Sequence, residues 1–336
     1  NEPQLLDIAS NDYLGLAAKS SIGSGASPLI SGFRRPHQAL SKEISSWTGY
    51  SSIRLFPSGY QANIGVICAI ADEQTVIFSD ESNHASIIDG CRLSNARKEI
   101  YKHLDYIDLE RRLKQYVNCP SDTRLLIISE TLFSMEGTFA DLSAARALAS
   151  QYNALLYLDE AHTIGAFGPE GSGYAREKCI TADLLLCTFG KAIGTAGAAI
   201  CTNDQIADHL TNFCRSFIYS TSPCQLTATR TRQHVEHIRG KYGTTQRKKL
   251  HANISTFSTF AKTCHSLRIG GKTTSPIRYI CCESEHDALY IAAQLHAHSI
   301  YAVAIRPPTV PTPRVRIVIS SQTDTTMLCQ VLKQIL

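Results

Sequence analysis

The chain has 336 residues, of which 43% are hydrophobic, and a formal net charge of +4. This length suggests two domains, and the composition is sufficient for a sizeable core. Basic residues are scattered apart from short clusters such as Arg247–Lys249, so nucleic-acid binding is not favoured, although a weakly acidic partner is compatible. No run approaches the roughly 18–20 apolar residues of a membrane-spanning helix, so no membrane association is expected.

Short apolar runs alternate with helical patterns between residues 75 and 221. This alternation predicts βαβ units and an α/β fold with a mostly parallel sheet sandwiched by helices. A helix from Tyr60 to Ala71 is expected before this alternating region. The expected strands are Thr75–Ser79, Arg124–Ser129, Ala154–Leu158, Asp183–Thr188, Gly197–Cys201 and Phe217–Ser220. The expected helices between them are Leu109–Val117, Asp141–Tyr152 and Asp204–Arg215, with N-caps at Asp141 and at Asn203 or Asp204.

The pattern changes near residues 240–245, which predicts a boundary to a smaller C-terminal α/β domain. The sequence thus predicts an N-terminal segment 1–30 that packs with the small domain, a large domain over 31–240 and a small domain over 241–336. The elements expected in the small domain are a helix over Arg247–Thr263, a strand over Ile277–Cys281, a helix over His286–His298, strands over Tyr301–Ile305 and Arg314–Ile319, and a last helix after Thr323.

The twelve cysteines contain no Cys-x-x-Cys pair, and several, such as Cys68, stand in apolar runs where Cys packs as a small hydrophobe. The stretch 1–7 is acidic and lacks the basic region of a signal peptide. A large chain with these properties is typical of a reducing compartment, which predicts a cytoplasmic protein. The histidine pairs at 234 and 237 and at 296 and 298 do not have the spacing of a zinc site, so no metal is expected.

The segment Asp183–Gly194 reads as a buried strand that emerges into a turn with glycines on both sides of Lys191. In an open parallel sheet, ligands bind outside the carboxyl ends of the strands. A desolvated lysine at such a place can lose its proton and form a Schiff base with an aldehyde. The alternative for any single lysine is a surface side chain in a loop.

Acidic and imidazole side chains follow other expected strands. Asp159, Glu160 and His162 come directly after Ala154–Leu158, and buried acids are costly unless they are paired. Asp159 could hold the protonated nitrogen of a pyridine ring, which makes such a ring an electron sink for carbanions. The alternative is a capping Asp beside a surface Glu.

Three further motifs are weaker when taken alone. His84 follows the strand Thr75–Ser79 and could stack on a flat ring, or could simply satisfy a loop. Glu130–Gly137 follows the strand Arg124–Ser129, with polar side chains at Glu130 and Ser134. The glycine turn in Ser58–Asn63 opens a helix whose backbone N–H groups could bind phosphate. The chain has neither a Walker motif nor a Gly-x-Gly-x-x-Gly turn.

Together, these motifs resemble those of the α-oxoamine synthases, enzymes of fold type I that depend on pyridoxal 5'-phosphate (PLP). The resemblance covers nearly the whole chain and implies a large domain with a mostly parallel sheet, a smaller C-terminal α/β domain, and a homodimer with shared active sites. The matching segments are Asn11–Leu16, Ser58–Asn63, Asn83–Ser86, Asp159–His162, Thr188–Lys191 and Tyr219–Ser222.

Carried over residue by residue, the resemblance implies PLP as the cofactor, with Lys191 bound covalently to it. His84 would stack on the pyridine ring, Asp159 would hold the ring nitrogen, and His162 would hold the phenolic oxygen with Ser134 nearby. These roles imply that Lys191, His84, Asp159 and His162 are catalytic.

The resemblance also implies residues for the phosphate and for the substrate. Gly59, Tyr60 and Thr188 would surround the phosphate, joined by Thr221 of the other subunit. Arg314 would bind the carboxylate of the amino acid, a task to which the fork of a guanidinium is suited. Without the resemblance, Arg314 would be interpreted as a charge on an edge strand.

The segment Ala304–Pro311 resembles the biotin-pathway member of the family. This implies condensation of L-alanine with a pimeloyl thioester, carried by coenzyme A or acyl carrier protein, to give 8-amino-7-oxononanoate, CO2 and free thiol. One alternative is a sibling synthase that uses glycine or serine with another acyl-CoA. An inactive partner-binding subunit of this fold is another, which Lys191, Asp159 and His84 argue against, and a general aminotransferase is a third.

Overall fold

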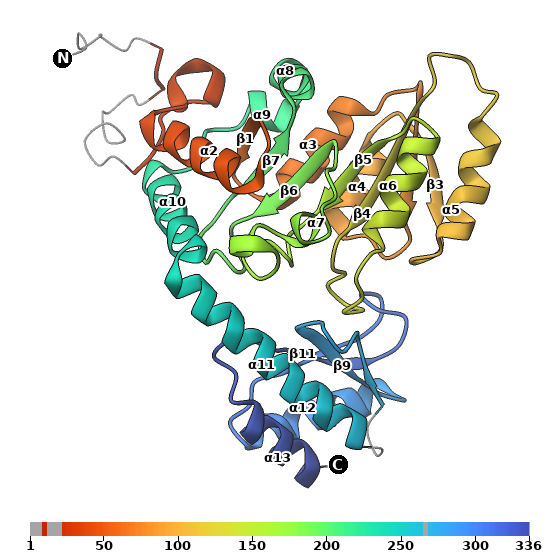
Figure 1. Ribbon diagram of the computed structural model, residues 1–336, viewed down its shortest axis with the longest axis vertical. Helices are drawn as coiled ribbons and strands as arrows, with labels where there is room; N and C mark the ends of the chain where they lie inside the picture. The colour runs from red at the N-terminus through yellow and green to blue at the C-terminus, as the bar shows by residue number, and fades with distance from the viewer. Residues whose placement is uncertain (1–8, 12–21, 265–267, 336) are drawn as a thin grey trace. The chain divides into compact units, whose positions relative to one another are not determined.

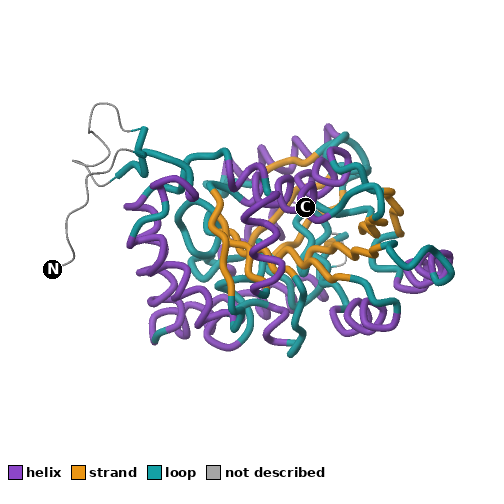
Figure 2. The backbone as a smooth tube through the Cα atoms, turned by 90° about the horizontal axis from the view of Figure 1, so that it is seen from above, coloured by secondary structure: helices purple, strands orange, loops and turns teal. Residues whose placement is uncertain are grey.

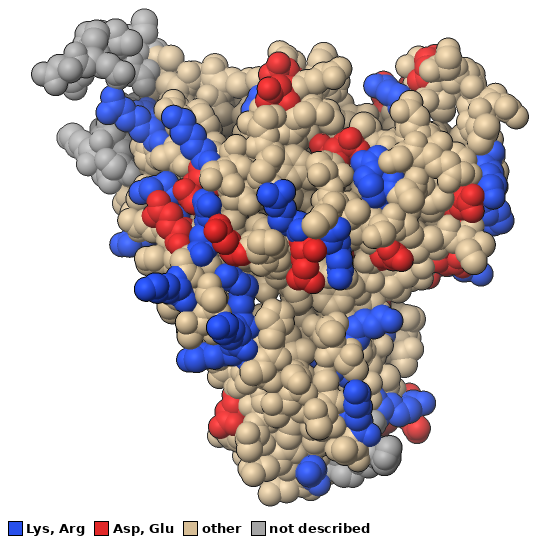
Figure 3. All heavy atoms as spheres, viewed as in Figure 1, with Lys and Arg blue, Asp and Glu red and all other residues tan. Residues whose placement is uncertain are grey.

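The computed structural model describes residues 9–11, 22–264 and 268–335 (Figure 1). The chain divides into two compact units, with unit 1 formed by Asn1–Thr131 and Ala140–Gly243 and unit 2 by Leu132–Phe139 and Thr244–Leu336. Apart from Asn11, the motif Asn11–Leu16 lies outside the described residues. On the face seen in Figure 3, acidic and basic side chains are interspersed over unit 1, as the weak net charge leads one to expect.

Unit 1 contains a seven-stranded sheet with the order β1-β7-β6-β5-β4-β2-β3. All neighbours from β6 to β3 pair in parallel, whereas β7 pairs antiparallel with both β6 and β1. The expected mostly parallel sheet is therefore confirmed. The strands are β1 (Ser52–Phe56), β2 (Thr75–Asp80), β3 (Arg97–Tyr101), β4 (Arg124–Glu130), β5 (Leu155–Asp159), β6 (Leu184–Thr188) and β7 (Ala198–Thr202).

Helices cover the sheet of unit 1, and Figure 2 shows helical segments around the strands. The α-helices are α2 (Arg35–Thr48), α3 (Gly59–Ile70), α4 (Ala85–Leu93), α5 (Tyr106–Leu113), α6 (Leu142–Gln151), α7 (Tyr174–Glu177), α8 (Asp204–Phe213), α9 (Arg215–Ile218) and α10 (Gln225–Arg239). Short 3₁₀ turns occupy Lys114–Tyr116 and Pro169–Gly171, and one π-helical turn occupies Pro28–Gly32.

The central strands are apolar on both faces, which is why a continuous apolar run forms each of them. In β4, Leu126 and Ile128 pack into a cluster with Val66 and Ile67 of α3 and Ile87 of α4. Successive side chains of a strand point to opposite faces, so Ile127, which is also buried, packs on the other face of the sheet. Burial on both sides fixes the strands and, with them, the place where each strand ends.

Most expected elements of unit 1 are confirmed within one to three residues, including the N-caps at Asp141 and Asn203. The strand expected over Phe217–Ser220 is wrong, because the chain forms α9 there. The amides of Phe217 and Ile218 donate to the carbonyl of Cys214, at 3.0 Å in each case. The ring of Phe217 then packs on that of Phe56, with centroids 5.8 Å apart. The apolar residues of this segment therefore serve a helical turn rather than a strand.

Unit 2 contains a four-stranded antiparallel sheet with the order β10-β11-β9-β8. Its strands and helices confirm the elements expected from the sequence and add β8, but α11 begins at Lys241, six residues before the expected start at Arg247. Side chains of α11, α12 and α13 form one apolar cluster with β9 and β11. The elements are α11 (Lys241–Thr263), β8 (Ile269–Gly270), β9 (Ile277–Cys281), α12 (Glu285–Ala297), β10 (Val303–Ile305), β11 (Arg314–Val318) and α13 (Thr325–Ile335).

Residues Leu132–Phe139 belong to unit 2, although we expected all of 31–240 in the large domain. Leu132 and Phe139 pair as an antiparallel bridge. The carbonyl of Gly137 accepts a 3.0 Å hydrogen bond from the amide of Lys272. Gly137 has a φ of +61°, and a Cβ there would lie 2.1 Å from the carbonyl oxygen of Ile277. Only glycine permits this close approach. The contact holds the segment Leu132–Phe139 against the start of β9.

The described part of the N-terminal segment belongs to unit 1, whereas we expected residues 1–30 to pack with the small domain. Ser24 Oγ donates to the carbonyl of Pro223 at 2.6 Å, and the amide of Gln225 donates to the carbonyl of Ile22 at 2.9 Å. These bonds tie the segment to the start of α10. Residues 1–8 and 12–21 of this expectation lie outside the described residues.

None of the helices in the described part of the chain combines the length and the apolar composition that crossing a membrane requires. The structure describes all twelve cysteines, and it places none of them in a disulfide. Within the described ranges, no group of three or more His, Cys, Asp or Glu side chains is placed to hold a metal ion.

Glu160 fixes the chain immediately after β5. Its amide donates to the carbonyl of Leu186 in β6 at 2.9 Å, and its fully buried carboxyl accepts from the amide of Ala175 in α7 at 2.6 Å. Gly173 has a φ of +101°, and a Cβ there would lie 1.5 Å from Glu160 Oε2, so only glycine fits. Burial raises the pKa of Glu160 to about 8. The carboxyl is therefore neutral over most of the ordinary pH range.

This pKa predicts how stability depends on pH. The unfolded carboxyl has a pKa of about 4.3. Because the folded pKa is higher, the contribution of Glu160 is fully present below about pH 4.3 and is lost as the pH rises to about 8. Glu160→Gln keeps the acceptor but cannot ionise. We expect the melting temperature of this variant to fall less than that of the wild type between about pH 5 and about pH 8.5, measured by circular dichroism.

The exposed Glu73 provides a matched control. Glu73→Gln should retain the pH dependence of the wild type. Equal losses of melting temperature in the wild type and Glu160→Gln would contradict the assignment of a neutral carboxyl.

Candidate active site

A pocket of about 410 Å³ lies in unit 1 at the carboxyl ends of β4, β5 and β6. The last residues of these strands, Glu130, Asp159 and Thr188, all line it. Glu130 and Asp159 are direct partners in the β4–β5 register. The volume falls within the range of about 300–1,000 Å³ that is usual for small-molecule sites. The parallel sheet thus brings together polar groups that are far apart in the sequence.

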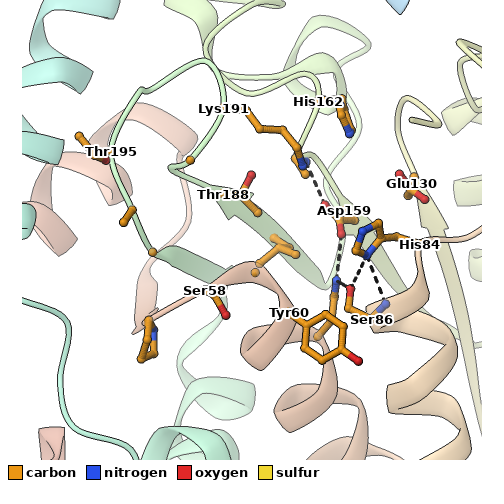
Figure 4. Close-up of a pocket in the computed structure, with 18 residues that line it drawn as sticks. Ser58, Tyr60, His84, Ser86, Glu130, Asp159, His162, Thr188, Lys191 and Thr195 are labelled. Carbon is orange, nitrogen blue, oxygen red and sulfur yellow. Dashed lines mark hydrogen bonds between the residues drawn. The ribbon is translucent and has the colours of Figure 1, made fainter. Parts of the chain in front are cut away.

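Lys191 lies in the loop between β6 and β7 and lines the pocket. Hydrogen bonds within the loop shape it: the amide of Thr195 donates to the carbonyl of Phe189 at 2.8 Å, and that of Gly194 donates to the carbonyl of Lys191 at 3.0 Å. The side chain of Lys191 points toward Asp159 (Figure 4). The loop therefore presents a primary amine to the inside of the pocket, beside a carboxylate.

Asp159 is 5% exposed, and hydrogen bonds from neighbouring groups hold its carboxylate in place. Asn63 Nδ2 donates to its Oδ2 at 3.0 Å, and the amide of Ala161 donates to its Oδ1 at 2.9 Å. A carboxylate oxygen can accept more than one hydrogen bond, so the group can still receive a donor from the pocket. A buried carboxylate is stable only when donors or positive charge compensate it, and this pocket favours a ligand with a protonated nitrogen.

His84 is the N-cap of α4 and lines the same pocket. Its Nδ1 lies 2.8 Å from Ser86 Oγ and accepts from the amide of Ser86 at 3.2 Å. Partial burial lowers the pKa of His84 below its ordinary value, while the charge of Asp159 raises it and that of Lys191 lowers it. A neutral imidazole therefore faces the pocket at neutral pH.

The start of α3 forms a cradle suited to an anion. Ser58 caps this helix by accepting from the amide of Gln61 at 3.2 Å. A Cβ at Gly59 would lie 2.6 Å from Thr188 Cγ2, so glycine is required for the close approach. Among the described residues, Thr188 Oγ1 is buried without a hydrogen-bond partner. A helix N-terminus beside an unsatisfied hydroxyl is a favourable place for a phosphate.

Tyr60 lines the pocket and is 46% exposed. Its hydroxyl donates to Asp89 Oδ2 of α4. This hydrogen bond raises the pKa of Tyr60, so the hydroxyl stays protonated and holds the first turn of α3 to α4.

The pocket collects most of the residues singled out in the sequence, but not all of them. Thr221 lies in unit 1, is exposed, and does not line the pocket. Ser134 and Arg314 belong to unit 2. The singled-out residues that line the pocket are Gly59, Tyr60, His84, Asp159, His162, Thr188 and Lys191.

The sequence analysis assigned no role to several other residues that line the pocket. Asn63 and Ser86 lie inside the recognised motifs, but only the structure shows that they join Asp159 to His84. Thr195 lies in the loop of Lys191, and its Oγ1 is 2.7 Å from Thr231 Oγ1. No spacing in the sequence indicates this pair, because α10 carries its second member.

Arg314 begins β11 and is 7% exposed within unit 2. Its Nη1 donates to the carbonyl of Met135 at 3.0 Å, and its Nε lies 3.3 Å from the carbonyl of Thr312. The guanidinium lies over the ring of Tyr279, 4.3 Å from the centroid. In the described part of the chain, no hydrogen bond uses Nη2, so this edge can receive an acceptor.

Known proteins similar to this chain agree on one family. The family model described as "Aminotransferase class I and II" matches residues 3–335. The "Putative 8-amino-7-oxononanoate synthase" of Aquifex aeolicus is 35% identical over 93% of this chain and 85% of its own length. The 8-amino-7-oxononanoate synthase of Photobacterium profundum is 36% identical over 93% of this chain and 82% of its own length.

Solved structures give the same result. A crystal structure of 8-amino-7-oxononanoate synthase from Francisella tularensis matches with a TM-score of 0.76 and 26% identity over 90% of this chain and 86% of the other. A structure of SPT with PLP matches with a TM-score of 0.87 and 25% identity over 97% and 85%. Serine palmitoyltransferase from Sphingomonas wittichii, 24% identical over 95% and 82% with a TM-score of 0.88, shares the fold.

The pocket fits PLP on its own chemistry. The ligand has an aldehyde, a ring nitrogen that can carry a proton, and a phosphate. An amine at Lys191, a buried carboxylate at Asp159, and the cradle of Gly59 and Thr188 match these three groups. The chain therefore belongs to the aminotransferase class I and II family and, within it, to the α-oxoamine synthases, PLP-dependent acyltransferases of fold type I.

Proposed function

We propose that this protein condenses L-alanine with a pimeloyl thioester in biotin biosynthesis. The carboxyl group of alanine leaves as CO2, the thioester releases its thiol, and the product is 8-amino-7-oxononanoate. The observation that carries the proposal is the pocket in which Lys191, Asp159 and His84 come together. The names of relatives that match over more than nine-tenths of the chain support the choice of substrates.

PLP, when bound, supplies an aldehyde for an amine to attack and a ring that takes up electron density from a carbanion. In our proposal, Lys191 would hold the cofactor covalently. When its Nζ is a free amine, it would take up the Cα proton of the amino acid. Because Asp159 is already fixed by Asn63 and Ala161, it can hold a proton on the ring nitrogen without rearranging.

The remaining pocket residues hold the cofactor in this proposal. His84 covers the ring, and His162 binds the phenolic oxygen, with Ser134 nearby. Gly59, Tyr60 and Thr188 bind the phosphate, supported by the helix start and by the buried hydroxyl of Thr188.

Arg314 binds the carboxylate of the amino acid in this proposal, through the guanidinium edge that carries Nη2. Its contacts with Met135, Thr312 and Tyr279 leave that edge available and hold the rest of the group still. Either coenzyme A or acyl carrier protein would deliver the pimeloyl group. None of the twelve cysteines, all of which lie in the described residues, forms a disulfide, which suits a reducing compartment such as the cytoplasm.

A substrate panel tests the reaction. The purified protein with PLP and pimeloyl-CoA is incubated with L-alanine, glycine or L-serine, and products are identified by mass spectrometry. We expect 8-amino-7-oxononanoate with L-alanine, at least about tenfold faster than any product with the other two, because such a difference corresponds to only about 1.4 kcal/mol of selectivity. The panel is repeated with a longer-chain acyl-CoA, and turnover with glycine or serine there, but none with alanine and pimeloyl-CoA, would favour the sibling synthase instead.

We further propose that the protein is a homodimer. Large apolar side chains are exposed on segments near Thr221, where the π-helical turn at 28–32 contacts α9 and Gly32 packs against Ser222. Leu29, Ile30, Tyr219 and Leu226 are 45%, 60%, 71% and 49% exposed. A cluster of this kind is typical of a surface that another protein covers. A second copy covering it would bring Thr221 of one subunit to the phosphate of the other.

Replacing one of these residues tests the dimer. Ile30→Lys places a charge in the proposed interface, so we expect the sedimentation coefficient to shift toward that of a monomer and PLP binding to weaken. Ile107→Lys is the control, because Ile107 is 82% exposed on α5, away from this cluster. A monomeric wild type, or an unchanged dimer in Ile30→Lys, would contradict the proposed interface.

A further inference from the structure

We propose that Asn63 and Ser86 are positioning residues that hold His84 as a neutral imidazole with its proton on Nε2. The inference rests on the proposed function only insofar as His84 is the group that covers the cofactor ring. It follows from the directions of five hydrogen bonds in the network that links Asp159 to His84, so it does not depend on the identity of the substrate.

The first direction is set by Asp159. A carboxylate only accepts, so the atom of Asn63 that lies 3.0 Å from Asp159 Oδ2 must be the amide nitrogen. Asn63 Oδ1 then accepts from the hydroxyl of Tyr157 at 2.7 Å. Burial raises the pKa of Tyr157 well above its ordinary value, so this hydroxyl keeps its proton and donates. Asn63 is 1% exposed and has one orientation that satisfies both neighbours.

The second proton on Asn63 Nδ2 points to Ser86 Oγ, 2.9 Å away. Ser86 Oγ therefore accepts from Asn63 and directs its own proton to its other neighbour, His84 Nδ1, at 2.8 Å. The backbone amide of Ser86 donates to the same nitrogen at 3.2 Å. With two donors directed at it, Nδ1 must present its lone pair, and the proton of the neutral ring is on Nε2.

Charged groups around the ring come from three elements. Asp159 at the end of β5 and Asp89 on α4 favour the imidazolium, whereas Lys191 in the β6–β7 loop disfavours it. Partial burial is the largest influence and also disfavours the charged form. A proton on Nδ1 would face the N–H of Ser86, and the Ser86 hydroxyl would have to accept rather than donate. The hydrogen bonds therefore also favour the neutral ring.

The neutral ring has a consequence for the site. Asp159 is placed to keep a proton, and hence positive charge, on a pyridine nitrogen. An imidazolium over that ring would repel this charge, whereas a neutral imidazole can stack on it. The Nε2–H also leaves His84 with one defined donor in the pocket. Asn63 thus orients the acid that binds the ring nitrogen and, through Ser86, the imidazole that covers the ring.

The tautomer can be measured directly by NMR on protein labelled with ¹⁵N-histidine, with and without PLP. The signals of His84 are assigned by their loss in His84→Asn. We expect an unprotonated Nδ1 and a protonated Nε2 in the wild type at neutral pH. A protonated Nδ1 or an imidazolium would overturn the proposal without any variant.

Ser86→Ala removes the side-chain donor to Nδ1. We expect a mixture of tautomers and a His84 titration midpoint raised by about one pH unit, because the lost hydrogen bond favoured the neutral form. The acid limb of kcat/KM should move to higher pH by the same amount. Ser86→Thr keeps the hydroxyl and should restore the behaviour of the wild type.

Ser94→Ala is the matched control. Ser94 is also a buried serine at the other end of α4, but its hydroxyl donates to the carbonyl of Cys91. Equal shifts of the His84 midpoint in the Ser86 and Ser94 variants would overturn the proposal. The expected tautomer in a protein that makes no product would uphold this inference and reject the proposed function, whereas product formation with a protonated Nδ1 would do the reverse.

Discussion

The site depends on a buried carboxylate at the end of a central strand. Asp159 is the last residue of β5 and is almost inaccessible to water, so its charge must be compensated by donors. The chain supplies Asn63 from α3 and the amide of Ala161, and Lys191 points toward the same group. Asn63 also donates to Ser86, which contacts His84. The orientation of Asn63 that Asp159 requires therefore also determines the hydrogen bonding of the His84 imidazole. Packing on both faces of the sheet keeps this acid in place.

In our proposal, the two units have different roles in binding the cofactor and the substrate. Unit 1 contains the sheet, the amine of Lys191, and the cradle at Gly59 and Thr188, so in our account it holds the cofactor. Unit 2 contains Arg314, whose guanidinium is fixed by backbone carbonyls and by the ring of Tyr279. Residues Leu132–Phe139 leave unit 1 and return to it, and Gly137 allows them to pack against β9. The arginine that we propose for the substrate is therefore anchored partly by chain that separates β4 from α6.

The sequence predicted the central strands β2, β4, β5, β6 and β7 well because they are continuous apolar runs that end in polar residues. It did not predict the edge strands β1 and β3, and β3 is mostly polar and exposed. Lys191, Asp159 and His84 could be found for the same reason, since each follows such a run. The strand expected over Phe217–Ser220 was wrong because a segment of only four residues with mixed polarity is compatible with a strand or with a helical turn. The excursion Leu132–Phe139 could not be assigned, since its partners Lys272 and Ile277 are distant in the chain. The link from Asn63 through Ser86 to His84 depends on side-chain directions, which no spacing reveals.

The central claim is that Lys191 is the amine that binds PLP. The purified protein is incubated with PLP and reduced with borohydride, and its peptides are analysed by mass spectrometry. The account predicts one modified peptide that carries the cofactor on Lys191, lost in Lys191→Ala and retained in Lys248→Ala, whose lysine is exposed on α11. Modification of another lysine at equal yield, or the same label in Lys191→Ala, would contradict it.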